Sequence, residues 1–297
     1  MARVLVLGDV MIDLIVRPEG PLAIGADRRA KIVARSGGSG ANQAVWLARF
    51  GVKARFVGRV GAADRDFETK ILREAGVEAH IAADESRETG RLIALIDPHG
   101  ERSFLTDRGA NDGLVAGDIP DGLLDDVDHA HISGYAFIDS QARRAAIDLL
   151  ERAKARGVPT SVDPASSEFL REIGPSNFVA WTRGADIAFP NEDEALVLTG
   201  ADEPGEQLTR LSAHYPLVVL KRGVAGSAAA EGAERWRAFA PRVAAIDTTG
   251  AGDAFLAAFL AARLSGAPVD ACLQRANEAG AAATLFLGGR PEARQAI

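Results

Sequence analysis

One segment carries the strongest structural signal in this chain: Asp247-Thr248-Thr249-Gly250-Ala251-Gly252-Asp253-Ala254-Phe255. Its three small residues at positions 250 to 252 lie where a long, apolar, alanine-rich stretch begins, Ala251 to Leu264, which predicts a buried helix. Small residues there let backbone N–H groups converge, and the helix dipole makes that end positive. The segment therefore predicts an anion-binding site at the start of a buried helix.

Asp253 falls in the first turn of that helix. A carboxylate beside a bound phosphoryl group can accept the proton of a hydroxyl that attacks the phosphorus. The helix dipole should favour its charged form, which makes it a weak base, and a loose transition state tolerates a weak base. The alternative is a glycine-rich turn in which an acidic residue merely compensates the dipole.

Outward from this segment, short apolar runs alternate with helical patterns along most of the chain. The runs typical of strands are Val4 to Leu7, Ala54 to Val57, His129 to Ser133, Pro159 to Val162, Ile187 to Phe189 and Leu217 to Leu220. The helical patterns are Asn42 to Phe50, Phe67 to Ala75, Gln141 to Arg156, Ala251 to Leu264 and Val269 to Leu287. This alternation predicts an α/β fold with a Rossmann-like, mostly parallel central sheet and helices on both faces.

Two segments interrupt the alternation. Arg91 to Asp97, the turn Pro98-His99-Gly100 and Glu101 to Thr106 predict a β-hairpin, and Met11 to Val16 with Lys31 to Ala34 can supply partner strands. We expect a small β-sheet lid built from about residues 11–34 and 88–108, although an ordinary extension of the main sheet fits the same pattern. Because the chain has no repeat or obvious linker, a single domain over 1–297 is the simpler prediction.

Composition excludes several classes of protein. The 297 residues are 47% hydrophobic and 25% charged, with a net charge of -7, which argues against nucleic acid as the main partner. The 29 arginines nevertheless provide fixed positive sites for a small anion. The apolar run near the amino terminus is too short for a signal peptide, and no stretch reaches the length of a membrane span. We therefore expect a cytoplasmic protein without a membrane partner.

A second glycine-rich turn, Ser36-Gly37-Gly38-Ser39-Gly40-Ala41-Asn42, also opens a helix. It does not match the G-x-G-x-x-G dinucleotide fingerprint, which disfavours a dinucleotide-dependent oxidoreductase. No lysine follows a glycine anywhere in the chain, so a Walker A loop is absent. The turn suits close backbone approach to a polyhydroxylated ligand, with Asn42 as donor and acceptor, or Asn42 simply caps the helix.

Together these motifs resemble the PfkB family of carbohydrate kinases, of which ribokinase is the best-known member. Gly37 to Gly51 is similar to the family's first signature and Asp247 to Phe255 to its second, and Asn191-Glu192-Asp193-Glu194 is similar to its N-x-x-E motif. The resemblance implies a ribokinase-like fold and ATP-dependent phosphorylation of a hydroxyl on a small sugar or sugar derivative. It implies Mg²⁺ as the accompanying ion, and a homodimer formed through the lid. A nucleoside kinase, a sugar-phosphate kinase and an inert sugar sensor are the alternatives, and Asp253 favours an enzyme.

The resemblance also assigns residues. It implies Asp253 as catalytic base and the amides of Gly250, Ala251 and Gly252 as the anion hole. The acceptor-binding residues that it implies are Asp13, Gly38, Asn42 and Asn111. Those implied for ATP are Asn191, Lys221, Gly223, Gly226 and Asn277, with Glu194 positioning Mg²⁺, directly or through water. Those implied for a monovalent cation such as K⁺ are Asp247, Thr249 and Gly289.

Three departures from ribokinase leave the acceptor open. Ribokinase has asparagine where Met11 stands and lysine where Ser39 stands, and some relatives carry D-x-N-x-R where this chain has Asp163 to Ser167. An anionic acceptor would need cations, for which the candidate arginines are Arg28, Arg29, Arg35, Arg102 and Arg108.

Overall fold

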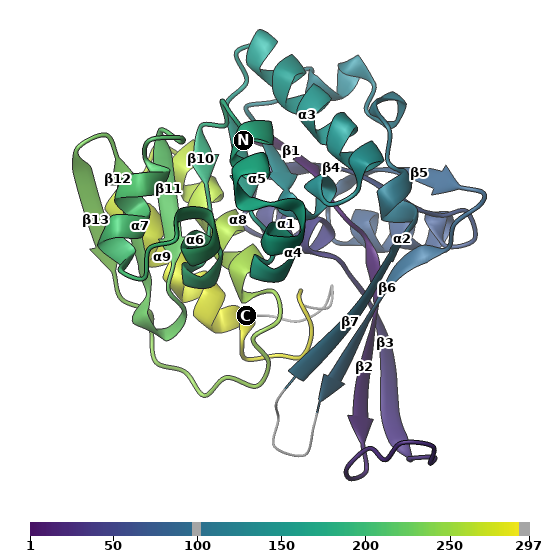
Figure 1. The fold of residues 1–297 in the computed structure, drawn as a ribbon. Helices are drawn as coiled ribbons and strands as arrows, with labels where there is room; N and C mark the ends of the chain where they lie inside the picture. The colour runs from purple at the N-terminus through teal and green to yellow at the C-terminus, as the bar shows by residue number, and fades with distance from the viewer. Residues whose placement is uncertain (97–101, 291–297) are drawn as a thin grey trace.

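The computed structural model describes residues 1–96 and 102–290, and its centre is a nine-stranded sheet (Figure 1). The strand order is β13-β12-β11-β10-β9-β8-β1-β4-β5. The strands are β1 (Arg3–Leu7), β4 (Lys53–Gly61), β5 (Glu78–Asp84), β8 (His129–Ser133), β9 (Thr160–Asp163), β10 (Ile187–Ala188), β11 (Leu217–Lys221), β12 (Ser227–Glu231) and β13 (Glu234–Ala238). All neighbouring strands from β5 through β4, β1, β8, β9 and β10 to β11 pair in parallel. Strands β12 and β13 are antiparallel additions at one edge. The predicted mostly parallel sheet is confirmed.

Helices cover both faces of the sheet because the buried strands are apolar on both sides. In β1, Val4 and Val6 pack into the core that contains α1, α2, α8 and α9, whereas Leu5 and Leu7 pack into the core of α3 to α7. The helices are α1 (Ser39–Arg49), α2 (Arg65–Glu74), α3 (Ser140–Ala155), α4 (Ser167–Ile173), α5 (Pro175–Trp181), α6 (Glu192–Thr199), α7 (Pro204–Leu211), α8 (Ala251–Leu264) and α9 (Val269–Ala283). Among the described residues, no helix combines the length and apolar character needed to cross a membrane.

A second, four-stranded sheet projects from the main body (Figure 1). Its order is β3-β2-β6-β7, with β2 and β6 parallel and the outer pairs antiparallel. The strands are β2 (Met11–Pro18), β3 (Ala30–Gly37), β6 (Thr89–Ile96) and β7 (Arg102–Gly109). This small sheet uses the predicted segments, although the predicted turn at 98–100 lies outside the described residues.

Two predicted helix boundaries were wrong by three residues or more. Helix α1 begins at Ser39, earlier than the predicted Asn42, because Gly38 takes φ +94° and lets the chain turn directly into the helix. Helix α9 ends at Ala283 rather than Leu287. The chain beyond it turns through Gly288, at φ +95°, and brings Gly289 against Gly250. This early end places the carboxyl-terminal segment beside the start of α8.

The parallel strands deliver polar residues to a single edge of the sheet, as parallel topology requires. Asp9 follows β1, while Asp163 ends β9 and Lys221 ends β11. The amino termini of α1 and α8 meet at the same edge, since Ser39 and Asp253 are in contact. The small sheet joins the main body there too, because β2 begins at Met11.

Candidate active site

Asp253 lies in the first turn of α8, and its carboxylate faces the first turns of α1. Ser39 donates its hydroxyl to Oδ1 at 2.7 Å, and Gln43 donates Nε2 to the same oxygen at 3.1 Å. Asn42 donates Nδ2 to Oδ2 at 3.2 Å. The glycine-rich turn at 36–42 and the start of α1 therefore supply the donors that orient the Asp253 carboxylate.

The environment of Asp253 changes its acidity. Burial raises the pKa of Asp253 to about 7 and the charge of Asp163 adds to the rise, while the Ser39 and Asn42 hydrogen bonds and the Lys221 ammonium lower it. The expectation that the helix dipole keeps Asp253 a weak base was wrong, because the cost of burying the charge exceeds these favourable interactions. A carboxylate with a pKa near neutrality is suited to general-base catalysis.

The glycines of the α8 turn have different structural roles. Gly250 caps the helix with φ +75°, and the backbone of Gly289 occupies the position that its β-carbon would take. Gly252 has room for a methyl group, and the nearest atom to that position is Nζ of Lys221, at 3.6 Å. The turn therefore separates the carboxyl-terminal segment on one side from Lys221 on the other.

A lysine and two carboxylates form a buried cluster beside this turn. Lys221 donates Nζ to Oδ2 of Asp163 at 3.1 Å. Burial opposes the charge of Lys221, but Asp163 and Glu194 raise its pKa above the ordinary value. Burial raises the pKa of Glu194 to about 7, against the lowering effect of Lys221. The cluster therefore places the Lys221 ammonium group beside the amino terminus of α8.

Asn191 and Glu194 form a reciprocal capping box at the start of α6. Glu194 accepts from the Asn191 backbone at 2.8 Å and from its Nδ2 at 2.7 Å, and Asn191 Oδ1 accepts from the Glu194 amide at 2.8 Å. The described residues contain no group of three or more metal-ligating side chains. Because Mg²⁺ keeps several waters and binds through one or two carboxylates plus substrate phosphates, the buried pair Asp163 and Glu194 fits an ion brought in by a nucleotide.

A cleft of about 520 Å³ opens next to the α8 turn. Lys221, Gly223, Gly226 and Asn277, all four predicted to contact ATP, line it, as do Ala251 and Gly252 of the predicted anion hole. Asn277 donates Nδ2 to the carbonyl of Ala238 at 3.1 Å. The cleft is large enough for a nucleotide and ends at the start of α8. Asn191, the fifth residue predicted to contact ATP, does not line the cleft, and it contacts the site by its hydrogen bonds with Glu194.

A second cavity, of about 550 Å³, lies between the small sheet, α2 and residues 288–290. Asp13 of β2 lines it with Glu68 of α2 and Arg290. Burial raises the pKa of Asp13 to about 7, and Asp9 and Glu68 add to the rise, while Arg290 opposes it. Gly289 also lines this cavity and packs against Gly250, so the α8 turn lies between the two cavities.

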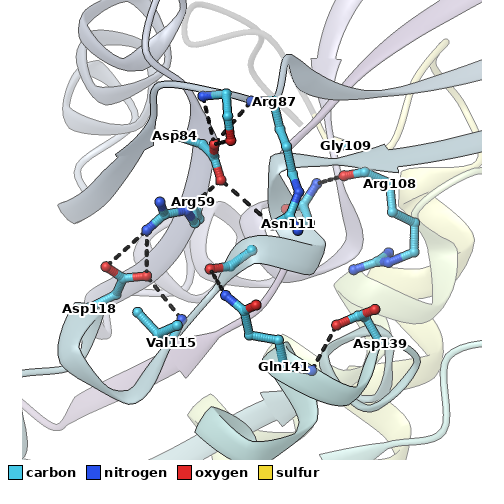
Figure 2. Close-up of polar contacts among 12 residues, drawn as sticks. Arg59, Asp84, Arg87, Arg108, Gly109, Asn111, Val115, Asp118, Asp139 and Gln141 are labelled. Carbon is cyan, nitrogen blue, oxygen red and sulfur yellow. Dashed lines mark hydrogen bonds and ion pairs between the residues drawn. The ribbon is translucent and has the colours of Figure 1, made fainter.

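The other predicted acceptor residues shape the site through the backbone. Asn111 donates Nδ2 to the carbonyl of Arg108 at 2.9 Å (Figure 2). It also donates Nδ2 to the carbonyl of Val10 at 2.9 Å and accepts from the Val10 amide at 3.0 Å. Its amide therefore clamps the β1–β2 connection to the base of the small sheet. Gly38 lies so close to the Asp9 carbonyl that a side chain would collide with it.

A polar network fixes this base to the main body (Figure 2). Arg59 of β4 lies between two carboxylates, with 3.0 Å ion pairs to Asp84 and Asp118. Ser86, Arg59 and Arg87 hold the pKa of Asp84 well below its usual range, even though burial opposes them. These contacts anchor the end of β5, from which the chain runs on into β6 of the small sheet.

The predicted cation residues lie together behind the α8 turn. The carboxylate of Asp247 accepts from the amide and hydroxyl of Thr249, at 2.9 and 2.7 Å, and from the amide of Gly288 at 2.9 Å. The Gly289 carbonyl accepts from Trp46 Nε1 at 3.1 Å. The three residues are thus neighbours, and Asp247 ties the carboxyl-terminal segment to the turn.

Sequence reasoning missed four residues of this site: Gln43, Glu68, Asp163 and Arg290. Asp163 had a signal, because it opens the segment that departs from D-x-N-x-R. Among the arginines considered, Arg28 and Arg29 are exposed, whereas Arg108 pairs with Asp112 at 3.0 Å and stacks over Tyr135. His129 and His131 both contact Ser161, at 2.7 and 2.8 Å, and burial lowers both pKa values, to about 4 and 3, so they are neutral strand histidines.

Comparison with known proteins gives consistent matches along the chain. The sequence model of the pfkB family of carbohydrate kinases matches residues 1–294. The ATP-dependent ribose-1-phosphate kinase of Halopiger xanaduensis is 30% identical over 100% of this chain and 95% of its own. The adenosine kinase structure from Sinorhizobium meliloti superposes with a TM-score of 0.89 at 27% identity, covering 98% of this chain and 96% of its own. The Vibrio cholerae fructokinase structure with fructose, ADP and calcium ion bound gives 0.84 at 27% identity, covering 99% and 96%.

Proposed function

Because this chain belongs to the pfkB family of carbohydrate kinases, we propose that it transfers the terminal phosphate of ATP to a hydroxyl of a small sugar or sugar derivative through Asp253. The observation that carries this proposal is the position of the α8 turn. Ala251 and Gly252 line the nucleotide-sized cleft, whereas Gly250 packs against Gly289 of the second cavity. A donor in one cavity and an acceptor in the other meet at this turn.

Asp253 accepts the proton of the acceptor hydroxyl as the phosphoryl group leaves ATP. The Ser39, Asn42 and Gln43 donors hold its carboxylate in one orientation, so little reorganisation is needed in the transition state. The amides of Gly250, Ala251 and Gly252 and the Lys221 ammonium offer positive charge where negative charge develops on the phosphoryl oxygens.

The nucleotide lies in the cleft formed by Lys221, Gly223, Gly226 and Asn277. Asp163 and Glu194 are the residues that would hold Mg²⁺, directly or through water, and the ion would supply positive charge that offsets the phosphate charge of the nucleotide. A K⁺ ion near Asp247, Thr249 and Gly289 would stabilise the turn. Use of ATP as donor supports a cytoplasmic location.

The acceptor occupies the cavity beneath the small sheet, which acts as a lid. Asp13 accepts hydrogen bonds from adjacent hydroxyls, and Gly38 lets the backbone approach. Oδ1 of Asn42 is buried and has no partner among the described residues, which leaves it for a further hydroxyl. Exposed apolar side chains on the small sheet, Ile32, Phe104 and Leu105, support pairing of two lids in a homodimer.

A sugar-phosphate or nucleoside acceptor is the second candidate. It is supported by the ribose-1-phosphate kinase and the adenosine kinase among the similar proteins. The test is ATP-dependent ADP release with pentoses, hexoses, sugar acids, sugar phosphates and nucleosides. Wild-type protein should turn over one class, and Asp253→Asn should lower kcat by roughly 10²–10⁴ with unchanged ATP affinity, the usual scale for a lost general base. Equal turnover by both proteins would contradict the role of Asp253.

A further inference from the structure

Arg290 brings an unused positive charge to the cavity beneath the small sheet. It lines this cavity together with Asp13 and Glu68. Its two terminal nitrogens, Nη1 and Nη2, are buried and have no hydrogen-bond partner among the described residues. Glu68 is half satisfied, since Oε1 accepts from Ser36 Oγ at 2.9 Å whereas Oε2 is buried without a partner in the described parts of the chain.

Such an arrangement is costly for a protein that binds nothing there. A buried guanidinium without acceptors loses its hydration and gains no hydrogen bond in return. Glu68, Asp13 and Asp253 are close enough to act on its charge, but no carboxylate of the described residues accepts from its terminal nitrogens. The donors of Nη1 and Nη2 are therefore left for a ligand.

The chemistry of the guanidinium indicates what that ligand carries. Its planar fork of N–H donors matches two oxygens of a carboxylate or a phosphate, and charge-assisted hydrogen bonds of this kind are the strong ones. Asp13 and Glu68 Oε2 offer acceptors that suit hydroxyl groups. The cavity thus combines a site for an oxyanion with sites for a polyol.

We propose that the phosphate acceptor of this kinase is an anionic sugar derivative, whose carboxylate or phosphate group is bound by Arg290. This inference rests on the proposed function and names its substrate class. Asp13 and Glu68 hold the hydroxyls of the acceptor, and the anionic group anchors it so that another hydroxyl reaches Asp253. Arg290 lines the acceptor cavity and not the nucleotide cleft, which favours a contact with the acceptor over one with ATP.

The test compares matched acceptors with wild-type protein and the variants Arg290→Gln and Arg290→Lys. A neutral sugar, its aldonate and its monophosphate are each assayed by ADP release, and the preferred anion tells carboxylate from phosphate. We expect wild-type kcat/KM to be higher for one anion than for the neutral sugar by about 10- to 100-fold, as a charged hydrogen bond implies. Arg290→Gln should remove this preference, mainly through KM, and Arg290→Lys should restore part of it.

The exposed Arg183 provides the matched control, because Arg183→Gln removes the same charge at a position that lines neither cavity. Thermal unfolding of each variant checks that it is folded. A wild-type preference for the neutral sugar would overturn the proposal. An equal loss with neutral and anionic acceptors would also overturn it, since Arg290 would then act on the phosphoryl group or only balance nearby carboxylates.

Failure of the kinase assignment gives a different result. In that case wild-type protein releases no more ADP than Asp253→Asn does with any of the acceptors. Calorimetric titration with the aldonate, the monophosphate and the neutral sugar then tests Arg290 without catalysis. Tighter binding of one anion to wild-type protein than to Arg290→Gln supports the inference, and equal binding contradicts it.

Discussion

Ser39 and Asp253 are 214 positions apart in the sequence, yet the Ser39 hydroxyl donates to Oδ1 of Asp253 at 2.7 Å. The contact joins the first turn of α1 to the first turn of α8, and so connects the two glycine-rich segments. It also opposes the effect of burial on Asp253, because the hydrogen bond stabilises the ionised carboxylate. Where ribokinase has a lysine, this chain thus has a hydroxyl that orients its candidate base.

Removing that hydroxyl should make Asp253 less acidic. In Ser39→Ala the pKa of Asp253 rises above its value of about 7, so the acidic limb of the kcat/KM profile moves to higher pH. A shift of roughly one pH unit is expected, because a hydrogen bond to a charged group is worth about 1.5–3 kcal/mol. Ser212→Ala is the control, since Ser212 bonds the Leu208 carbonyl in α7. An unmoved limb would contradict the contact's role.

Asp253 should also reduce stability at high pH. Its folded-state pKa is raised by burial, so the native state holds a proton that the unfolded state loses between about pH 4 and 7. This contribution to stability is complete below the unfolded pKa and disappears as pH rises through about 7. Asp253→Asn cannot ionise, and its Tm should exceed that of wild type at about pH 8 and match it at about pH 4.

The size of that effect follows from the same linkage. We expect a difference of roughly 8–16 °C at about pH 8, because a pKa raised from 3.8 to about 7 is worth roughly 4 kcal/mol and about 1 kcal/mol shifts the Tm of a large domain by about 2–4 °C. Asp202→Asn, at an exposed position, controls for loss of charge alone. A Tm difference that is independent of pH would indicate altered packing in place of altered ionisation.

The two glycines of the α8 turn should respond differently to alanine. Gly250→Ala forces a β-carbon into the backbone of Gly289 at φ +75°, so we expect a loss of stability well above about 1 kcal/mol. Gly252→Ala meets only the Lys221 side chain, at ordinary contact distance, and should fold normally while raising KM for ATP. Gly157→Ala, at φ +68° with open space around it, isolates the backbone strain. Chemical denaturation of all three measures the difference.

Lys221 and Asp163 should move the pH profile in opposite directions. Lys221 lowers the pKa of Asp253, whereas Asp163 raises it. Lys221→Met should therefore move the acidic limb of kcat/KM to higher pH, and Asp163→Asn should move it to lower pH. Lys221→Met should also lower kcat by about 10²-fold, the scale for one lost donor to a developing oxyanion. Shifts in the same direction would contradict the opposite effects of Lys221 and Asp163 on the pKa of Asp253.

The local part of this site could be predicted from sequence. The start of α8 is encoded by consecutive small residues followed by an alanine-rich apolar stretch, and both signals act within a few residues. Gly223 and Gly226 of the cleft could also be predicted from a local signal, because they come shortly after the apolar run Leu217 to Leu220. By contrast, β12 has the alanines Ala228 to Ala230, which lack the β-branching typical of strands, and it was missed.

The remaining contacts depend on tertiary structure. Asp163 meets Lys221 because β9 and β11 both pair with β10, a register that no short motif specifies. Arg290 enters the acceptor cavity because α9 ends at Ala283 and the chain folds back toward Gly250. The pKa of Asp253 likewise depends on burial by distant segments, which is why its rise to about 7 could not be predicted from the local helix dipole.

A crystal structure with a non-hydrolysable ATP analogue and Mg²⁺ would show where the terminal phosphate of the donor lies. We expect the γ-phosphate within hydrogen-bond distance of the amides of residues 250–252, next to the Asp253 carboxylate, with the adenosine in the cleft of Gly223 and Asn277. A polyphosphate chain bound away from residues 250–253 would contradict this expectation.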